Sequence, residues 1–275
     1  MTALLSSTTT PLHHYEGLNS DHLSWLAARY NQNVIMRRIV SPVLASNCYV
    51  LFDEDSRRAV VVDPGGHTAD SVHSWLTENE ASVAAVVLTH GHPDHFWDAA
   101  QVAGDAPVII PGPDRYRLEA PSFAMPPELD FRQLTGYDWQ RPATIEDLDP
   151  SLLQGEGAEV ADGLKMRALP APGHSEGSTV LFVMASLDHD LASYVTTRPT
   201  KADDSPHLVM LAGDVLFAGS MGRTDLPGGD DEEMKSSLRT LKTVVNPETI
   251  VLPGHGPATV MAHENATNPF LQFRS

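Results

Sequence analysis

Short apolar runs separated by polar turns divide the first third of the chain into strands and one helix. Strands are expected at 34–40, 48–52 and 59–62. Three strands in such quick succession predict an antiparallel meander. The segment 68–80 instead carries Val72, Trp75 and Leu76 at the i, i+3, i+4 spacing of an amphipathic helix.

The following run, 83–88, is apolar at every position, which indicates a strand covered on both faces. It ends in the polar turn 89–95, and a second helix is expected from there to about residue 102. Further strands are expected at 108–110, 165–169, 179–183, 208–211 and 250–252. A helix at 231–245 has Asp230 or Asp231 as its N-cap and acidic residues in its first turn. The alternation of strands and helices favours a layered α/β domain.

Three segments depart from this alternation of strands and helices. Residues 1–32 are assigned to a peripheral N-terminal segment with a short helix at 21–30, and 33–275 to one domain. Within that domain, the proline-rich segment 111–150 excludes long regular elements but carries enough apolar anchors to predict an ordered flap. The aspartate-rich segment 186–206 is interpreted as a solvated surface insertion.

Charge and cysteine content narrow the classes of function. With 18 basic and 36 acidic residues, the formal charge of −18 repels phosphate backbones and anionic lipids, so neither nucleic acid nor a membrane is expected as a partner. The lone Cys48 lies in an apolar run and is expected to be a buried strand residue, and it excludes an intramolecular disulfide. Without a signal-like N-terminus or a membrane-spanning run, a cytoplasmic location is expected.

The turn after the buried strand concentrates potential metal ligands. His90, His92, Asp94 and His95 fall within six residues. A strand end is rigid, and the intervening Gly91 and Pro93 force a tight turn that can direct these side chains into one cavity. Imidazoles suit zinc, and carboxylates mixed with imidazoles also admit iron or manganese. The alternative, a histidine-rich surface turn, is the better interpretation of a single His-x-His pair alone.

Three later segments favour the metal site over that alternative. His174, Asp214 and His255 each lie beside a glycine, at or just beyond the end of an expected strand. Loops at strand ends of α/β sheets are where functional sites collect. Several ligand-type residues in such positions together favour a shared centre.

The order HxHxDH, His, Asp, His, together with Asp63-Pro64-Gly65-Gly66, resembles the metallo-β-lactamase superfamily from about Ile35 to Thr259. The resemblance implies an α/β fold, a four-layer αβ/βα sandwich of two mixed sheets flanked by helices. It also implies that His90, His92 and His174 hold one metal, that Asp94, His95 and His255 hold a second, and that Asp214 bridges them. Asp63 would support the ligand turn from behind rather than bind a metal.

The segment 222–225, Gly-Arg-Thr-Asp, is similar to a signature of the glyoxalase II-like (hydroxyacylglutathione hydrolase-like) group, particularly its short bacterial members. This likeness implies hydrolysis of a small-molecule thioester. Two divalent ions, zinc in the first instance with iron or manganese as alternatives, would share a hydroxide by lowering the pKa of water from about 15.7 toward roughly 7. Asp94 and Asp214 would be catalytic, and Arg223 would bind substrate.

Two alternatives remain open at this point. The same Gly-Arg-Thr-Asp segment also resembles that of the persulfide dioxygenases, which would use His90, His174 and Asp214 around a single iron. The second alternative is a member of the family without catalytic activity, in which the metals only stabilise the fold. The presence of Asp94 and Asp214 disfavours it. Only about twenty residues follow His255, so we do not expect the helical domain with which classical glyoxalase II enzymes hold glutathione.

Overall fold

The computed structural model describes residues 33–124, 129–195 and 206–273, and the helix predicted at 21–30 lies outside them. The strands are β1 Val34–Val40, β2 Asn47–Asp53, β3 Arg58–Val62, β4 Ser82–Val87, β5 Val108–Ile110, β6 Ile145–Asp147, β7 Ala158–Ala161, β8 Leu164–Pro170, β9 Thr179–Leu187, β10 His207–Gly213, β11 Leu216–Phe217, β12 Ser220–Met221, β13 Ile250–Pro253 and β14 Thr259–Val260. The α-helices are α2 Ala69–Glu78, α3 Pro93–Phe96, α4 Ala99–Ala103, α5 Arg115–Glu119, α6 Phe131–Thr135, α7 His189–Ser193, α8 Asp231–Val244 and α9 Met261–Thr267. Short 3-10 helices lie at η2 Gly112–Asp114, η3 Pro121–Ala124, η4 Pro150–Leu153 and η5 Pro269–Leu271.

The sheet has two halves that meet at the pair β1 and β9. In the first half, β1, β2 and β3 form the predicted antiparallel meander, and β4, β5 and β6 extend it in parallel. In the second half, β8, β9 and β10 are antiparallel and β13 is parallel to β10. The two halves share a short parallel pairing, Ile35 with Ser186 and Met36 with Leu187, because β9 is long enough to reach β1.

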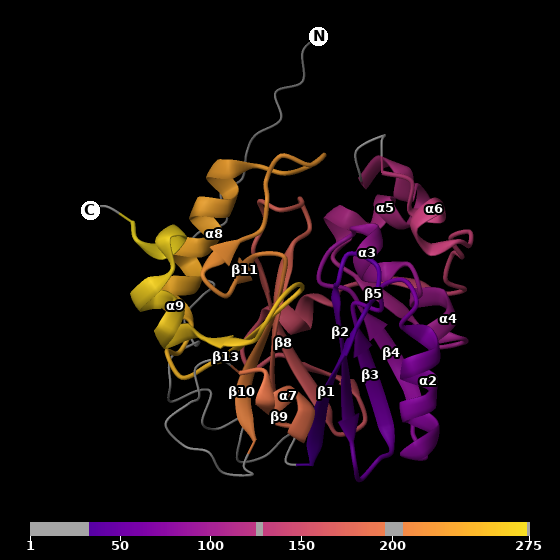
Figure 1. Ribbon diagram of the computed structural model, residues 1–275. Coiled ribbons are helices and arrows are strands. Elements are labelled where there is room, and N and C mark those ends of the chain that lie inside the picture. Colours follow the sequence, from indigo (N-terminus) through magenta and orange to yellow (C-terminus); the bar gives the residue numbers. More distant parts are fainter. Residues whose placement is uncertain (1–32, 125–128, 196–205, 274–275) are drawn as a thin grey trace.

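Helices cover the outer face of each half, giving the four layers expected from the family resemblance (Figure 1). Side chains of α2 and α4 pack on the first half, and side chains of α8 and α9 pack on the second. The central core lies between the two halves. Along β9 the side chains alternate between these layers, with Leu181 and Val183 in the central core and Val180 and Phe182 under α8.

The prediction of one helix from the ligand turn to residue 102 is wrong. The chain forms two short helices, α3 and α4, with Asp98 between them outside helical geometry. The Asp98 carboxylate accepts hydrogen bonds from the backbone N–H groups of Thr68 and Ala69, each at 2.9 Å, at the start of α2. Its side chain therefore serves the neighbouring helix, a tertiary role that the apolar periodicity does not reveal.

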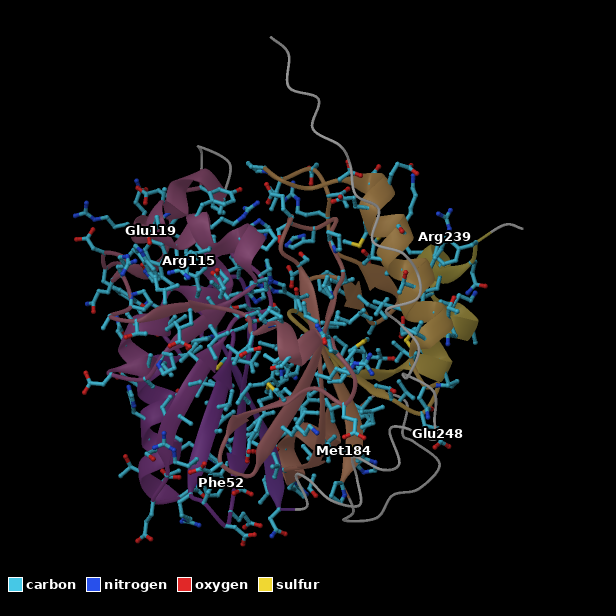
Figure 2. All side chains as sticks on the ribbon, turned by 180° about the vertical axis from the view of Figure 1, so that it is seen from behind. Phe52, Arg115, Glu119, Met184, Arg239 and Glu248 are labelled. Carbon is cyan, nitrogen blue, oxygen red and sulfur yellow. The ribbon has the colours of Figure 1, made fainter. Side chains whose placement is uncertain are left out.

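The proline-rich flap is ordered in its described parts, 111–124 and 129–150. Trp139 packs against Phe96 and Trp97, with ring centroids 4.8 and 5.9 Å apart, and Phe131 also contacts Trp97. The flap supplies α5, α6 and the edge strand β6, three elements too short to be predicted from periodicity. Figure 2 shows Arg115 and Glu119 of α5 on the side of the molecule opposite Arg239 of α8.

The segment 186–206 begins as regular structure. Strand β9 continues to Leu187 and α7 follows, with Asp188 as its N-cap, while residues 196–205 lie outside the description. Cys48 is buried in β2, as expected. No helix in the described part of the chain is long and apolar enough to cross a membrane.

Candidate metal centre

The first ligand turn is held from behind by Asp63. Its carboxylate accepts hydrogen bonds from the backbone N–H of Thr89 at 2.8 Å and from the Thr89 hydroxyl at 2.7 Å. Because that hydroxyl donates its proton to Asp63, it accepts one from Nδ1 of His90, 3.0 Å away. The lone pair of His90 therefore sits on Nε2. The bonds of Asp63 to Thr89 hold the turn, the contact expected from the sequence, and through the Thr89 hydroxyl they also set the tautomer of His90, which was not expected.

His90, His92 and His174 come together as the sequence predicted. Their ligand atoms lie within 4.8 Å of one another and all three residues are buried. Nδ1 of His92 is 2.7 Å from Nε2 of His174. On its other side, Nδ1 of His174 donates to the carbonyl oxygen of Arg223 at 2.7 Å, so Nε2 of His174 carries a lone pair. The backbone of the Gly-Arg-Thr-Asp segment thus orients a metal-ligand candidate.

A second group contains Asp94, His95 and His255, again with ligand atoms within 4.8 Å. Nε2 of His255 is 3.1 Å from Oδ2 of Asp94 and 3.3 Å from Nε2 of His95. Nδ1 of His95 faces Oδ2 of Asp63 at 3.3 Å, which directs Nε2 of His95 toward the group. Asp63 thus supports residues of both groups.

Asp214 lies between the two groups. One of its oxygens is 3.4 Å from Nε2 of His95, and the other is 3.5 Å from Nε2 of both His174 and His255. The turn that carries His255 approaches closely enough to require glycine, since a Cβ on Gly254 would stand 2.1 Å from Oδ1 of Asp214. All seven residues proposed as ligands from the sequence therefore converge.

Burial and mutual charge set the protonation of the centre. Burial lowers the pKa of His90, and burial together with His174 lowers the pKa of His92 to about 3. Burial alone would raise the pKa of Asp94 and Asp214, but the neighbouring imidazoles hold it below its usual range in both carboxyls. Burial alone would lower the pKa of His95 and His255, but Asp94 and Asp214 raise it in both imidazoles. Cation binding requires neutral imidazoles beside ionised carboxylates, so it would displace protons from the second group.

The residues present fit two cations. Nε2 of His90 and Oδ1 of Asp214 are buried and have no hydrogen-bond partner among the described residues, which is costly unless another group satisfies them. Nδ1 of His92 and Nε2 of His174 face each other at hydrogen-bond distance. Nε2 of His174 bears a lone pair, so this nitrogen can bind a cation. Five imidazoles and two carboxylates form a donor set suited to zinc, iron or manganese.

Two residues that gave no sequence signal, Asp114 and Arg117, join two of the turns that carry proposed ligands. Oδ2 of the buried Asp114 accepts from the backbone N–H of Gly91 at 2.6 Å and from the Ser175 hydroxyl at 2.7 Å, and its Oδ1 accepts from the N–H of Gly177 at 2.8 Å. The fully buried Arg117 pairs with Asp114 at 3.4 Å. Both lie in the flap, where no periodicity or motif singled them out.

Arg117 continues the same network outward. It forms a second ion pair with Glu176, and its Nη2 donates to the carbonyl oxygen of Pro227 at 2.8 Å. The flap, the His174 turn and the segment after Arg223 therefore share one buried guanidinium. An arginine near a proline-rich run gave no sequence signal for this role, because its partners lie 59 and 110 residues away.

A cavity of about 490 Å³ opens onto the centre. Of the proposed ligands, His92, Asp94, His174, Asp214 and His255 line it. The rest of its lining is Leu44, Leu129, Phe217, Ser220, Met221, Arg223 and Leu226. A volume of this size admits a small-molecule substrate.

Comparison with known proteins agrees with this geometry. The family model of the metallo-beta-lactamase superfamily matches residues 41–185. An uncharacterized protein of Mycobacterium tuberculosis is 32% identical over 84% of this chain and 94% of its own length. The hydroxyacylglutathione hydrolase GloC of Haemophilus influenzae is 30% identical over 86% of this chain and 98% of its own length.

Two solved structures are similar over 86% of this chain and all of their own. They are the B3 metallo-beta-lactamase BLEG-1, with a TM-score of 0.63, and TTHA1623 in a di-iron-bound form, with a TM-score of 0.61, each 28% identical. The family model covers four of the proposed ligands in the first turn and His174, and the relatives align over most of the chain. This chain therefore belongs to the metallo-beta-lactamase superfamily, as a metal-dependent hydrolase.

Proposed function

We propose that this protein hydrolyses a small-molecule thioester at a centre of two divalent cations. The observation that carries the proposal is the position of Asp214, whose two oxygens lie within 3.5 Å of imidazoles from both ligand groups. One carboxylate shared between two groups of ligands favours a paired centre over a single ion. The similarity to GloC, a hydroxyacylglutathione hydrolase, supports thioesters as the substrate class.

Bound cations would supply a water activated at neutral pH and a Lewis acid for the thioester carbonyl. The protein's own residues position the water and handle its proton. Asp94 and Asp214 both line the cavity, where Asp214 would be shared between the cations and Asp94 orients the attacking water. The proton released by that water passes by way of Asp94 to the departing thiolate. The thiol product leaves through the same cavity. Zinc is the first candidate for the cations, with iron or manganese as alternatives.

The persulfide dioxygenase alternative uses His90, His174 and Asp214 alone around one iron. The second group is as closely assembled as the first and consists of Asp94, His95 and His255. A centre with a single ion would leave this second group without a function. Loading with one equivalent of iron and following oxygen uptake on glutathione persulfide separates the two functions. The proposed hydrolase consumes no oxygen.

Loss of one ligand of the first group, or of the shared Asp214, should strongly reduce hydrolysis. Loaded with zinc, iron or manganese, the wild-type protein is expected to cleave members of a panel of acyl thioesters that includes S-lactoylglutathione, followed by thiol release. His92→Ala and Asp214→Asn should lower kcat by at least about 100-fold, the scale associated with losing one stabilising group at a reaction centre. His189→Ala is the matched control, because this side chain is 99% exposed. Inactivity of the loaded wild type on the whole panel would refute the proposal.

A further inference from the structure

Most of the residues that line the cavity besides the proposed ligands are apolar, and they are called the apolar wall below. They are Leu44, Leu129, Phe217, Met221 and Leu226, and Leu44 is 47% exposed. Side chains of this kind, gathered around a reaction centre and open to solvent, gain stabilisation only when an apolar group covers them. They indicate a substrate that brings such a group.

Leu44, which lines the cavity, lies in a strained turn. Leu44 and Ala45 both have positive φ angles, 55° and 56°, in the left-handed region that favours glycine or asparagine. The turn is tied down beside them, since the Ser46 hydroxyl donates to the carbonyl oxygen of Asp94 at 2.6 Å and Ser46 forms a β-bridge with His255. Strain of this kind persists at functional sites. An exposed leucine in such a position points to contact with a ligand.

Apart from the proposed metal ligands, the described residues that line the cavity include one basic side chain, that of Arg223. Asp225 holds its guanidinium in two hydrogen bonds, Nε to Oδ1 at 2.6 Å and Nη2 to Oδ2 at 2.7 Å. The bonds from Arg223 lower the pKa of Asp225 to about 2, so the pair stays ionised at ordinary assay pH. The charge of Arg223 is therefore already balanced.

We propose, resting on the thioester hydrolase function above, that this cavity selects thioesters with apolar, uncharged substituents and discriminates against thiols that carry carboxylates. Glutathione is such a disfavoured thiol, since it brings two carboxylates to a site whose arginine is paired and to a protein with a formal charge of −18. Arg223 acts on the centre through its backbone carbonyl, which orients His174, rather than as a clamp for a substrate carboxylate.

Matched substrates test the selection. The same acyl group is presented on N-acetylcysteamine, a neutral thiol, and on glutathione, and kcat/KM is measured with the cation-loaded protein. The neutral thioester is expected to be favoured by about tenfold or more, and each methylene added to a short acyl chain to raise kcat/KM by roughly threefold. Added salt should raise kcat/KM for the glutathione thioester, because it screens repulsion, and leave the neutral one unchanged.

Two variants locate the cause. Asp225→Asn releases Arg223 and should shift the preference toward the glutathione thioester. Leu44→Asn suits the left-handed turn, should retain bound metal and the thermal midpoint of unfolding, and should lower kcat/KM on long acyl chains more than on acetyl thioesters. Metal content, measured in both variants, shows whether the centre itself is intact.

The outcomes separate the two proposals. If no thioester is cleaved, the hydrolase function fails. If thioesters are cleaved but the glutathione ester is used as well as or better than its neutral match, the function stands and the selection proposed here is wrong. A preference for neutral esters that neither Leu44→Asn nor Asp225→Asn changes would overturn the assignment of its cause.

Discussion

At the scale of single residues, three of the five imidazoles are oriented by a partner that is not itself a proposed ligand. The Thr89 hydroxyl and the carbonyl of Arg223 fix the tautomers of His90 and His174, and the Asp63 carboxylate faces Nδ1 of His95 at 3.3 Å. The ligand types were predictable from the motif HxHxDH, and so was the support from Asp63. The carbonyl of Arg223 was not, because a backbone atom carries no sequence signature and becomes visible only when the chain folds back.

Asp63→Asn should weaken metal binding without removing any ligand. The amide supplies one acceptor oxygen in place of two, so it cannot serve the N–H and the hydroxyl of Thr89 while facing His95. Loss of such support lowers metal affinity by about 10- to 100-fold. The check is a competitive titration of the apoprotein with a chromophoric zinc chelator. Asp105→Asn, at an exposed position, is the control, and an Asp63→Asn affinity equal to that of the control would contradict this role.

At the scale of elements, the proposed ligands come from opposite halves of the sheet. The turn after β4 supplies the first four, whereas the turns after β8, β10 and β13 supply His174, Asp214 and His255. Continuous apolar runs predicted β4, β10 and β13, and the amphipathic patterns predicted α2 and α8. The elements that escaped prediction are short, such as β6, β7 and α5, or interrupted, such as α3 and α4. Their ends are decided by tertiary contacts like those of Asp98.

We expect the flap to stabilise the fold through Asp114, whose carboxylate binds two of the turns that carry proposed ligands. Asp114→Asn removes the buried carboxylate that pairs with Arg117 and leaves it only the partly exposed Glu176. Removing one partner of a buried pair costs about 3–5 kcal/mol of stability. Urea unfolding measures the loss. The matched control is Asp147→Asn, which breaks an Arg–Asp pair of the same segment whose carboxylate side chain is 61% exposed. There the loss should be about 0–1 kcal/mol. Equal losses in the two variants would contradict the role given to Asp114.

At the scale of the whole molecule, the centre joins two halves that otherwise share a small pairing. Strands β1 and β9 meet through two residue pairs, and the central core packs the remaining surfaces together. Cations held by His90 and His92 on one side and His174 on the other would add a direct link. The family resemblance predicted this architecture from the order of ligands along the chain. It could not predict the apolar wall, since Leu44, Leu129 and Leu226 are distant in sequence and share no motif.

The central claim is that seven side chains hold two cations. Anomalous diffraction from crystals of the zinc-loaded protein tests it most directly, because it counts the ions and locates them at once. The account predicts two peaks, one among His90, His92 and His174 and one among Asp94, His95 and His255, with Asp214 between them. A single peak after saturating zinc, or peaks elsewhere in the molecule, would contradict it.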